Sequence, residues 1–162
     1  MSDKDWLKKW AQYSPKKTAL VENDRSATYG ELNALADNYT GLLHAEYDLE
    51  KGDRIAILAS FSIELIALFG AAQKAGFVLV PINTRLTPRE VAYQIEDSAA
   101  KIVIAEADIS DKLSKTDLKS TSISDLEGEA NQYENEVEED DPIFILYTSG
   151  TTGFPKGAIY TH

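Results

Sequence analysis

Apolar residues recur at helical spacing in one long stretch of the chain, and a capping pattern marks the start of this helix and of a second one. Residues 29–47 repeat apolar side chains every three or four positions, which predicts an amphipathic helix. Thr28 is expected to cap this helix, because the glutamate three residues later completes a capping box. Thr87 begins the same pattern, and Pro88 takes the first helical position after it. Both helices are therefore predicted with defined starting residues.

Two further helices are predicted from other patterns. Residues 5–13 place apolar side chains on one side of a short helix, and we interpret Trp6 and Trp10 as a hydrophobic docking face, not a stack for a cofactor. Residues 62–75 are apolar nearly all round, which is typical of a buried helix. Gly76 follows in the position of a C-terminal cap.

Continuous apolar runs of strand length alternate with these helices. They cover residues 54–59, 77–82, 101–105 and 142–147. Strands without a polar face are expected in a parallel sheet that is covered on both sides. Two shorter strands, 18–22 and 25–28, flank an Asn-Asp turn. The order of elements predicts an α/β fold, with a doubly wound, mostly parallel sheet and flanking helices.

Residues 106–142 lose this periodicity and predict a short helix followed by an exposed, mobile connection. Within them, residues 116–142 hold ten acids and one lysine, which account for most of the formal net charge of −11. No acid follows Asp141. That absence suits a phosphate site, because a carboxylate repels phosphate; a solvated acidic linker beside a short buried segment explains the charge equally well.

The remaining composition narrows the class of protein. A length of 162 residues fits one domain, and the lack of cysteine excludes disulfides and thiolate chemistry. The N-terminus has no apolar signal core, and no apolar run approaches the roughly 20 residues that span a bilayer. We therefore expect no transmembrane segment, no nucleic-acid partner and a cytoplasmic location.

Residues 148–157 carry the chemistry suggested by the sequence. They read Thr-Ser-Gly-Thr-Thr-Gly-Phe-Pro-Lys-Gly and follow the last predicted strand. Glycines let backbone amides approach an anion, and the hydroxyls and Lys156 add donors and positive charge. The loop is not a Walker A motif, because Pro155 stands where that pattern needs its second glycine. A flexible, hydroxyl-rich turn between two strands is the alternative, and the fixed order of proline and lysine argues against it.

Residues 147–157 resemble the phosphate-loop signature of the adenylate-forming superfamily, which includes acyl- and aryl-CoA synthetases, firefly luciferase and peptide-synthetase adenylation domains. The resemblance extends over about residues 5 to 162 and includes segments 28–32, 51–56, 74–76, 81–88 and 97–101. It implies the first subdomain of the N-terminal, AMP-binding domain of such an enzyme. Pro81-Ile82-Asn83-Thr84-Arg85 and Gly150-Thr151-Thr152-Gly153 favour the acyl-CoA ligase branch over peptide synthetases.

The resemblance implies two half-reactions. A small-molecule carboxylate attacks the α-phosphate of ATP and releases pyrophosphate, and the thiol of CoA then displaces AMP from the acyl adenylate. The same resemblance implies that Lys156 is catalytic and that Thr148 is a ligand of Mg²⁺. The residues it implies for phosphate binding are Thr148, Ser149, Gly150, Thr151, Thr152, Gly153 and Lys156.

Enzymes of this superfamily are several times longer than this chain, and their C-terminal domain has no counterpart in it. We therefore expect an N-terminal fragment that is inactive alone, that binds the remainder of its own enzyme, and whose exposed apolar surface allows homodimers. A standalone nucleotide- or anion-binding module and a scaffold that does not use the signature are the alternatives. Arg85 and His162 are expected to be structural, the latter by a role such as helix capping, and His44 to lie on the surface.

Overall fold

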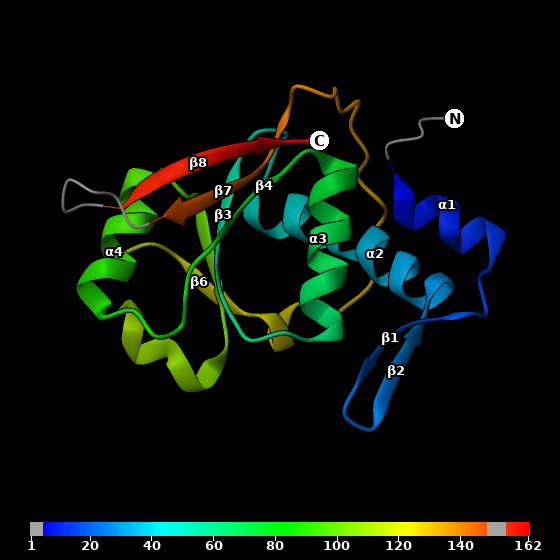
Figure 1. Cartoon of the computed structure of the whole chain (residues 1–162), viewed down its shortest axis with the longest axis horizontal. Coiled ribbons are helices and arrows are strands. Elements are labelled where there is room, and N and C mark those ends of the chain that lie inside the picture. Colours follow the sequence, from blue (N-terminus) through cyan, green and yellow to red (C-terminus); the bar gives the residue numbers. More distant parts are fainter. Residues whose placement is uncertain (1–4, 149–154) are drawn as a thin grey trace.

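A computed structural model describes residues 5–148 and 155–162 (Figure 1). The helices are α1 (Trp6–Tyr13), α2 (Tyr29–Tyr47), α3 (Ile63–Ala75), α4 (Pro88–Asp97) and the 3₁₀ segments η1 (Ala107–Leu113) and η2 (Ile123–Asp125). The strands are β1 (Thr18–Glu22), β2 (Arg25–Thr28), β3 (Arg54–Leu58), β4 (Val78–Pro81), β5 (Ile102–Ala105), β6 (Ser120–Ser122), β7 (Pro142–Thr148) and β8 (Lys156–Thr161). The helices and strands predicted from the apolar pattern are thereby confirmed, with ends that shift by one residue or less.

Six of these strands form one sheet in the order β6-β5-β3-β4-β7-β8. The strands from β6 to β7 in that order run parallel, and β8 pairs antiparallel with β7 at the edge. The short strands β1 and β2 form a separate antiparallel hairpin. The prediction of a doubly wound, mostly parallel sheet is confirmed, and the antiparallel edge strand is an addition to it.

Two apolar cores lie on the two faces of the sheet, as alternation along each strand requires. Ile55 and Ile57 of β3 belong to the core that contains α2 and α3. Ala56 and Leu58 belong to the core beneath α4 and η1. Figure 1 shows α2 and α3 on one side of the sheet and α4 on the other. The chain thus forms a three-layer α/β structure.

Both predicted capping boxes are present. The Thr28 hydroxyl accepts a hydrogen bond from the Glu31 amide at 3.3 Å, and the Glu31 carboxylate accepts one from the Thr28 amide at 2.8 Å. Thr87 and Glu90 make the same reciprocal pair at the start of α4. These local bonds fix where each helix begins, which explains why sequence pattern alone located both.

Residues 106–142 differ from the prediction in two respects. They contain β6, which adds a parallel strand beside β5, in addition to the expected short helix η1. The part after η2, residues 126–141, is called the acidic segment here; most of its residues are exposed, as expected, but it also makes hydrogen bonds along α2. Tyr133 donates its amide to Thr40, and its ring stacks on His44 with centroids 3.8 Å apart. His44 is accordingly half-buried, which corrects its expected place on the surface.

A buried lysine joins three helices on this side of the molecule. The side chain of Lys74 in α3 is only 1% exposed. Its ammonium lies 2.6 Å from the Asp5 carboxylate, 2.9 Å from Asp37 and 2.9 Å from the Asn33 amide oxygen. Because a buried charge is costly unless it is paired and hydrogen-bonded, these partners explain how a lysine is accommodated in an otherwise apolar helix.

Candidate phosphate-binding site

The predicted phosphate loop lies between the antiparallel strands β7 and β8. Ser149, Gly150, Thr151, Thr152 and Gly153 fall outside the described residues, so their assignment stays a prediction. The two strands that carry the ends of the loop are described. Thr148 ends β7, Lys156 begins β8, and the two are directly opposite each other in the pairing register. Both are exposed.

Thr148 and Lys156 project from the same face of this hairpin. Residues directly opposite in an antiparallel pair lie on one face, and the faces alternate along the strand. Phe144, on the Thr148 face of β7, packs edge-on against Phe69 of α3 with ring centroids 5.5 Å apart. The threonine hydroxyl and the lysine ammonium therefore flank the loop on the α3 side of the sheet.

The opposite face of the hairpin is fastened to α4. The Tyr147 hydroxyl donates to the Asp97 carboxylate at 2.6 Å, and the Tyr93 hydroxyl donates to the Pro155 carbonyl at 3.3 Å. Burial, followed by this bond to Asp97, raises the pKa of the Tyr147 hydroxyl well above its ordinary value, so it remains a donor. The two tyrosines fix both ends of the loop relative to one helix.

Gly157 allows the Tyr147 ring to lie across β8. A Cβ at Gly157 would lie 2.7 Å from the Ile145 side chain and 3.3 Å from the Tyr147 ring. Any larger residue would therefore collide with the Ile145 side chain and press on the ring whose hydroxyl reaches α4. The sequence placed Gly157 within the phosphate loop, and the structure gives it this additional packing role in β8.

The charge around the hairpin suits an anion. Residues 142–162 contain no acid. Asp97 lies on the α4 side of the hairpin, bonded to Tyr147. Asp141, just before β7, is paired with Lys51 at 2.6 Å, and that bond holds the pKa of the Asp141 carboxyl below its ordinary value. Lys156 and the Thr148 hydroxyl thus fit a phosphate group, which prefers cationic and hydroxyl donors.

Fewer side chains of the described residues suit a magnesium ion than suit a phosphate group. Thr148 offers one hydroxyl oxygen, and within residues 5–148 and 155–162 no three His, Asp or Glu side chains come together as a metal site. Mg²⁺ commonly takes few ligands from protein and several from water and phosphate oxygens. The described residues therefore fit a magnesium ion only as the companion of a bound nucleotide.

The point where the strand order reverses, between β3 and β5, is a common ligand site in α/β sheets. Here a carboxylate occupies it. The Glu106 side chain accepts hydrogen bonds from the Ser60 amide at 2.7 Å and the Ser60 hydroxyl at 3.1 Å. A carboxylate at this position disfavours phosphate, so the hairpin at β7 and β8 remains the better candidate.

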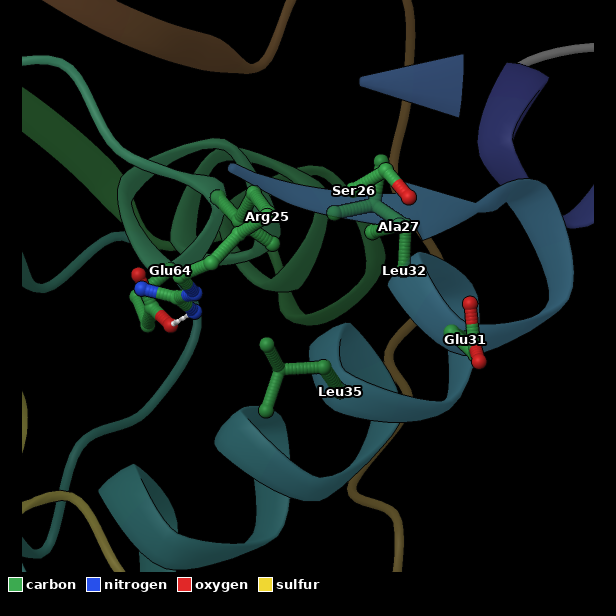
Figure 2. A pocket seen from close by; sticks show the side chains of 8 residues that line it. Arg25, Ser26, Ala27, Glu31, Leu32, Leu35 and Glu64 are labelled. Atoms are coloured by element: carbon green, nitrogen blue, oxygen red, sulfur yellow. Dashed lines mark hydrogen bonds and ion pairs between the residues drawn. The ribbon is translucent and has the colours of Figure 1, made fainter. Parts of the chain in front are cut away.

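A pocket of about 190 Å³ lies elsewhere, between the β1–β2 hairpin and the starts of α2 and α3 (Figure 2). Its lining comprises Arg25, Ser26, Ala27, Glu31, Leu32, Leu35, Ile63 and Glu64. Burial alone would raise the pKa of Glu64, but the hydrogen bond and charge of Arg25 lower it overall. Because its one arginine is already paired with Glu64, this pocket does not compete as a phosphate site.

The other residues singled out by sequence lie apart from the hairpin's open face. Arg85 is exposed in the turn after β4, where its amide donates to Asn83 at 2.9 Å. His162 directly follows β8, and its amide donates to the Asp141 carbonyl at 3.2 Å, which differs from the expected helix cap. Sequence reasoning did not find Tyr93 and Asp97, because their contacts with the hairpin join residues 62 and 50 positions apart.

Comparison with known proteins places this geometry in context. The chain is 38% identical over 96% of its length to the long-chain-fatty-acid–CoA ligase FadD13 of Mycobacterium tuberculosis, and covers 34% of that protein. It is 33% identical over 99% of its length to the 2-succinylbenzoate–CoA ligase of Bacillus licheniformis, and again covers 34%. It thus spans about a third of the length of these relatives.

Solved structures agree with the sequence comparison. The O-succinylbenzoate coenzyme A synthetase MenE of Bacillus subtilis, solved in complex with AMP, superposes with a TM-score of 0.86 at 31% identity. That match covers 96% of this chain and 42% of the other. The family model for AMP-binding enzymes matches residues 7–162, and the chain therefore belongs to the AMP-binding enzyme family.

Proposed function

We propose that this chain is the N-terminal part of an ATP-dependent carboxylate–CoA ligase that forms AMP. The observation that supports this most is the pairing of Thr148 with Lys156 on one face of an acid-free hairpin. The similarity to CoA ligases along almost the whole chain supports the reaction class. In this proposal residues 1–162 form part of the AMP-binding domain, and the C-terminal domain and acyl pocket belong to the rest of the protein.

In the first half-reaction, the hairpin positions the β- and γ-phosphates of ATP while a carboxylate attacks the α-phosphate. Lys156 neutralises charge on the departing pyrophosphate, and the Thr148 hydroxyl donates to a phosphate oxygen. Such catalysis depends on positioning and charge neutralisation, with no covalent step on the protein. The glycines and hydroxyls of residues 149–153 supply further donors in this proposal, and Mg²⁺ arrives with ATP, with Thr148 as one ligand.

The proposed substrates are inferred from the proteins to which this chain is similar. A fatty acid is the proposed carboxylate, because the FadD13 ligase shares 38% identity with this chain; an aromatic acid such as succinylbenzoate is the alternative. CoA is the proposed acceptor, and a cytoplasmic location remains part of the proposal. Among the helices in the described part of the chain, none has both the length and the apolar character needed to cross a bilayer.

The test separates the two half-reactions in the full-length protein. Lys156→Ala is expected to slow pyrophosphate release by about 10²–10³-fold, the range seen when one transition-state donor is lost. Thioester formation from preformed acyl adenylate is expected to change much less, since the pyrophosphate has already left. Lys115→Ala, at an exposed lysine away from the hairpin, is the matched control.

Equal losses in both half-reactions would contradict the role of Lys156. Adenylate formation without transfer to CoA would instead indicate another adenylate-forming enzyme, such as a peptide-synthetase adenylation domain. Thioester formation by residues 1–162 alone would overturn the proposal that the chain needs the rest of its enzyme. Tight binding of ATP by this chain alone would favour the standalone nucleotide-binding module.

A further inference from the structure

The N-terminal helix α1 exposes an aromatic stripe to solvent. Trp6 and Trp10 are each 43% exposed, and Tyr13 is 84% exposed. Their spacing of four and three residues places all three side chains on one side of the helix. Trp10 contacts both Tyr13 and Tyr29, with ring centroids 6.3 and 6.0 Å apart, so the stripe is continuous. Large aromatic residues gathered on an exposed face indicate a surface that binds something.

The rest of α1 is fixed to the body of the molecule. Leu7 is fully buried, so close to Gly70 of α3 that a Cβ there would lie 2.7 Å from a Leu7 methyl group. Asp5 caps the helix and is bound to the buried Lys74 at 2.6 Å. The helix therefore cannot turn its aromatic stripe inward without breaking these contacts. The stripe is presented to solvent by a rigid support.

The charge next to the stripe is opposite to that of the whole chain. Residues 6–17 contain four lysines and no acid, in a chain whose formal net charge is −11. Lys9, Lys16 and Lys17 are exposed. Lys8 lies on the far side of the helix from Trp6 and Trp10, where it binds Glu134 of the acidic segment at 2.8 Å. Glu134 thus lies on the side of α1 away from the aromatic stripe.

Figure 1 shows α1 at one end of the long axis of the molecule, with α4 and the start of β8 at the other. A surface at this end can bind a large partner without approaching the start of β8. The stripe stands on the outer side of a single helix whose other side is buried against the body of the molecule. A broad, flat, negatively charged partner is what this shape and charge fit.

We propose that α1, with Lys16 and Lys17 beyond it, binds peripherally to the surface of an anionic lipid bilayer. Tryptophan and tyrosine rings favour the headgroup region, where an apolar body and a polar edge are both accommodated. Amphipathic helices with such residues lie in the plane of the interface. Each lysine near an anionic surface contributes roughly a factor of five to binding. With three aromatic side chains and few lysines, the association is reversible and depends on salt.

The two tryptophans of the chain are both on this stripe, so tryptophan fluorescence, excited selectively over tyrosine, reports on it alone. The purified chain is mixed with phosphatidylcholine vesicles that contain about a third phosphatidylglycerol, or none. Anionic vesicles are expected to shift tryptophan emission to shorter wavelength and to pellet the protein. Brominated lipids in the same vesicles are expected to quench the emission. Neutral vesicles and high salt are expected to abolish most of these effects.

Matched variants distinguish binding by this surface from nonspecific effects of net charge and of exposed aromatic side chains. Lys16→Glu with Lys17→Glu is expected to reduce pelleting more than ten-fold, on the scale of roughly five-fold for each lysine removed. Arg89→Glu with Lys115→Glu makes the same change in net charge at exposed positions elsewhere and is expected to leave pelleting almost unchanged. Trp6→Ser with Trp10→Ser is expected to abolish it, while Phe61→Ser with Tyr160→Ser, at comparably exposed aromatics, is not.

Three results would overturn the proposal. One is the absence of pelleting with anionic vesicles. Another is an equal loss in the two charge-reversal pairs, which would show a nonspecific effect of net charge. The third is an emission shift that grows with protein concentration without vesicles, which would show that a second copy covers the stripe. Thermal unfolding followed by circular dichroism shows whether the double tryptophan variant is folded. If it is not, the double lysine variant still provides the test, because Lys16 and Lys17 are exposed and outside any helix.

Discussion

The layer formed by α2 and α3 and the hairpin formed by β7 and β8 are built in different ways. In the first, nine residues of α3 are buried, and the acidic segment is bonded along α2. In the second, most of β8 is exposed, with Ile159 65% and Tyr160 51% exposed. Side-chain hydrogen bonds of Tyr93 and Tyr147 fasten this hairpin to α4. The candidate chemistry lies in the hairpin, the less supported of the two.

This difference suggests that the α2–α3 layer stabilises the chain, whereas the β7–β8 hairpin serves binding. Protein regions open locally with free energies that range from near zero to the global value, and binding loops come from the lower end. The α2–α3 layer, with its buried Lys74, should therefore set the free energy of unfolding. The hairpin should open at lower cost, and changes in it should affect binding more than global stability.

The largest expected effect on stability comes from Lys74. Lys74→Met keeps most of the side-chain volume but leaves the carboxylates of Asp5 and Asp37 near each other without their cation. The expected loss is about 3 kcal/mol in the free energy of unfolding, as for other broken buried ion pairs. Urea denaturation measures it, with Lys115→Met at an exposed lysine as control. A loss no larger than that of the control would show that the buried network adds nothing.

A smaller loss is expected at Gly41 of α2. A Cβ there would lie 2.1 Å from the Asn131 carbonyl oxygen in the acidic segment, so the segment must move away. Gly41→Ala should cost about 2 kcal/mol, because overpacking outweighs the better helix propensity of alanine. In the comparison variant Gly70→Ala, the nearest atom is a terminal methyl group of Leu7 at 2.7 Å, which can shift more easily than a backbone carbonyl, and the cost should be lower. The reverse order would mean that the acidic segment is not held against α2.

A substitution at Tyr147 tests the β7–β8 hairpin. Tyr147→Phe removes the hydroxyl that binds Asp97, with an expected cost of about 1 kcal/mol for a hydrogen bond to a charged group that is partly exposed. Hydrogen exchange should accelerate in β8 and remain unchanged in α3, because the bond supports the hairpin alone. Tyr13→Phe, whose side chain is 84% exposed, should change neither. Faster exchange throughout the chain would contradict the separation between the two regions.

The smallest effect concerns pH and the capping boxes. The hydrogen bonds from Thr28 lower the pKa of Glu31 below its ordinary value of 4.5, and those from Thr87 do the same for Glu90. Stability from these carboxylates is therefore present above the unfolded pKa and lost as pH falls through the folded one. Glu31→Gln with Glu90→Gln should flatten the fall in stability below about pH 4.5, measured by urea denaturation. Glu127→Gln, at an exposed glutamate outside any helix, is the matched control.

The sequence predicted those parts of the fold that local patterns determine. The starts of α2 and α4 depend on a threonine and a glutamate three residues apart, and the strands on uninterrupted apolar runs. β6 was missed because Ser-Thr-Ser has no apolar residue, and β8 because Lys156 and Gly157 were assigned to the loop. In β8, the run Ile-Tyr-Thr was the available indication of a strand.

The same local sequence patterns could not predict contacts between residues that lie far apart in the sequence. Nothing near Lys74 in the sequence indicates that Asp5 and Asp37 would surround it, and nothing near Tyr147 indicates Asp97. At the candidate site, the sequence supplied Thr148 and Lys156, and the strand register added their shared face. Their role in binding phosphate remains a prediction, as do the roles assigned to residues 149–153.

The most direct test of that role is a double-mutant cycle between Thr148 and Lys156 in the full-length protein. Thr148→Val, Lys156→Met and the double variant are compared by KM for ATP in pyrophosphate release. If both side chains bind the same phosphate from one face of the hairpin, the double variant should lose less than the two single losses combined, with a coupling of about 1 kcal/mol. Losses that simply add would show that the two residues act independently and would contradict the proposed site.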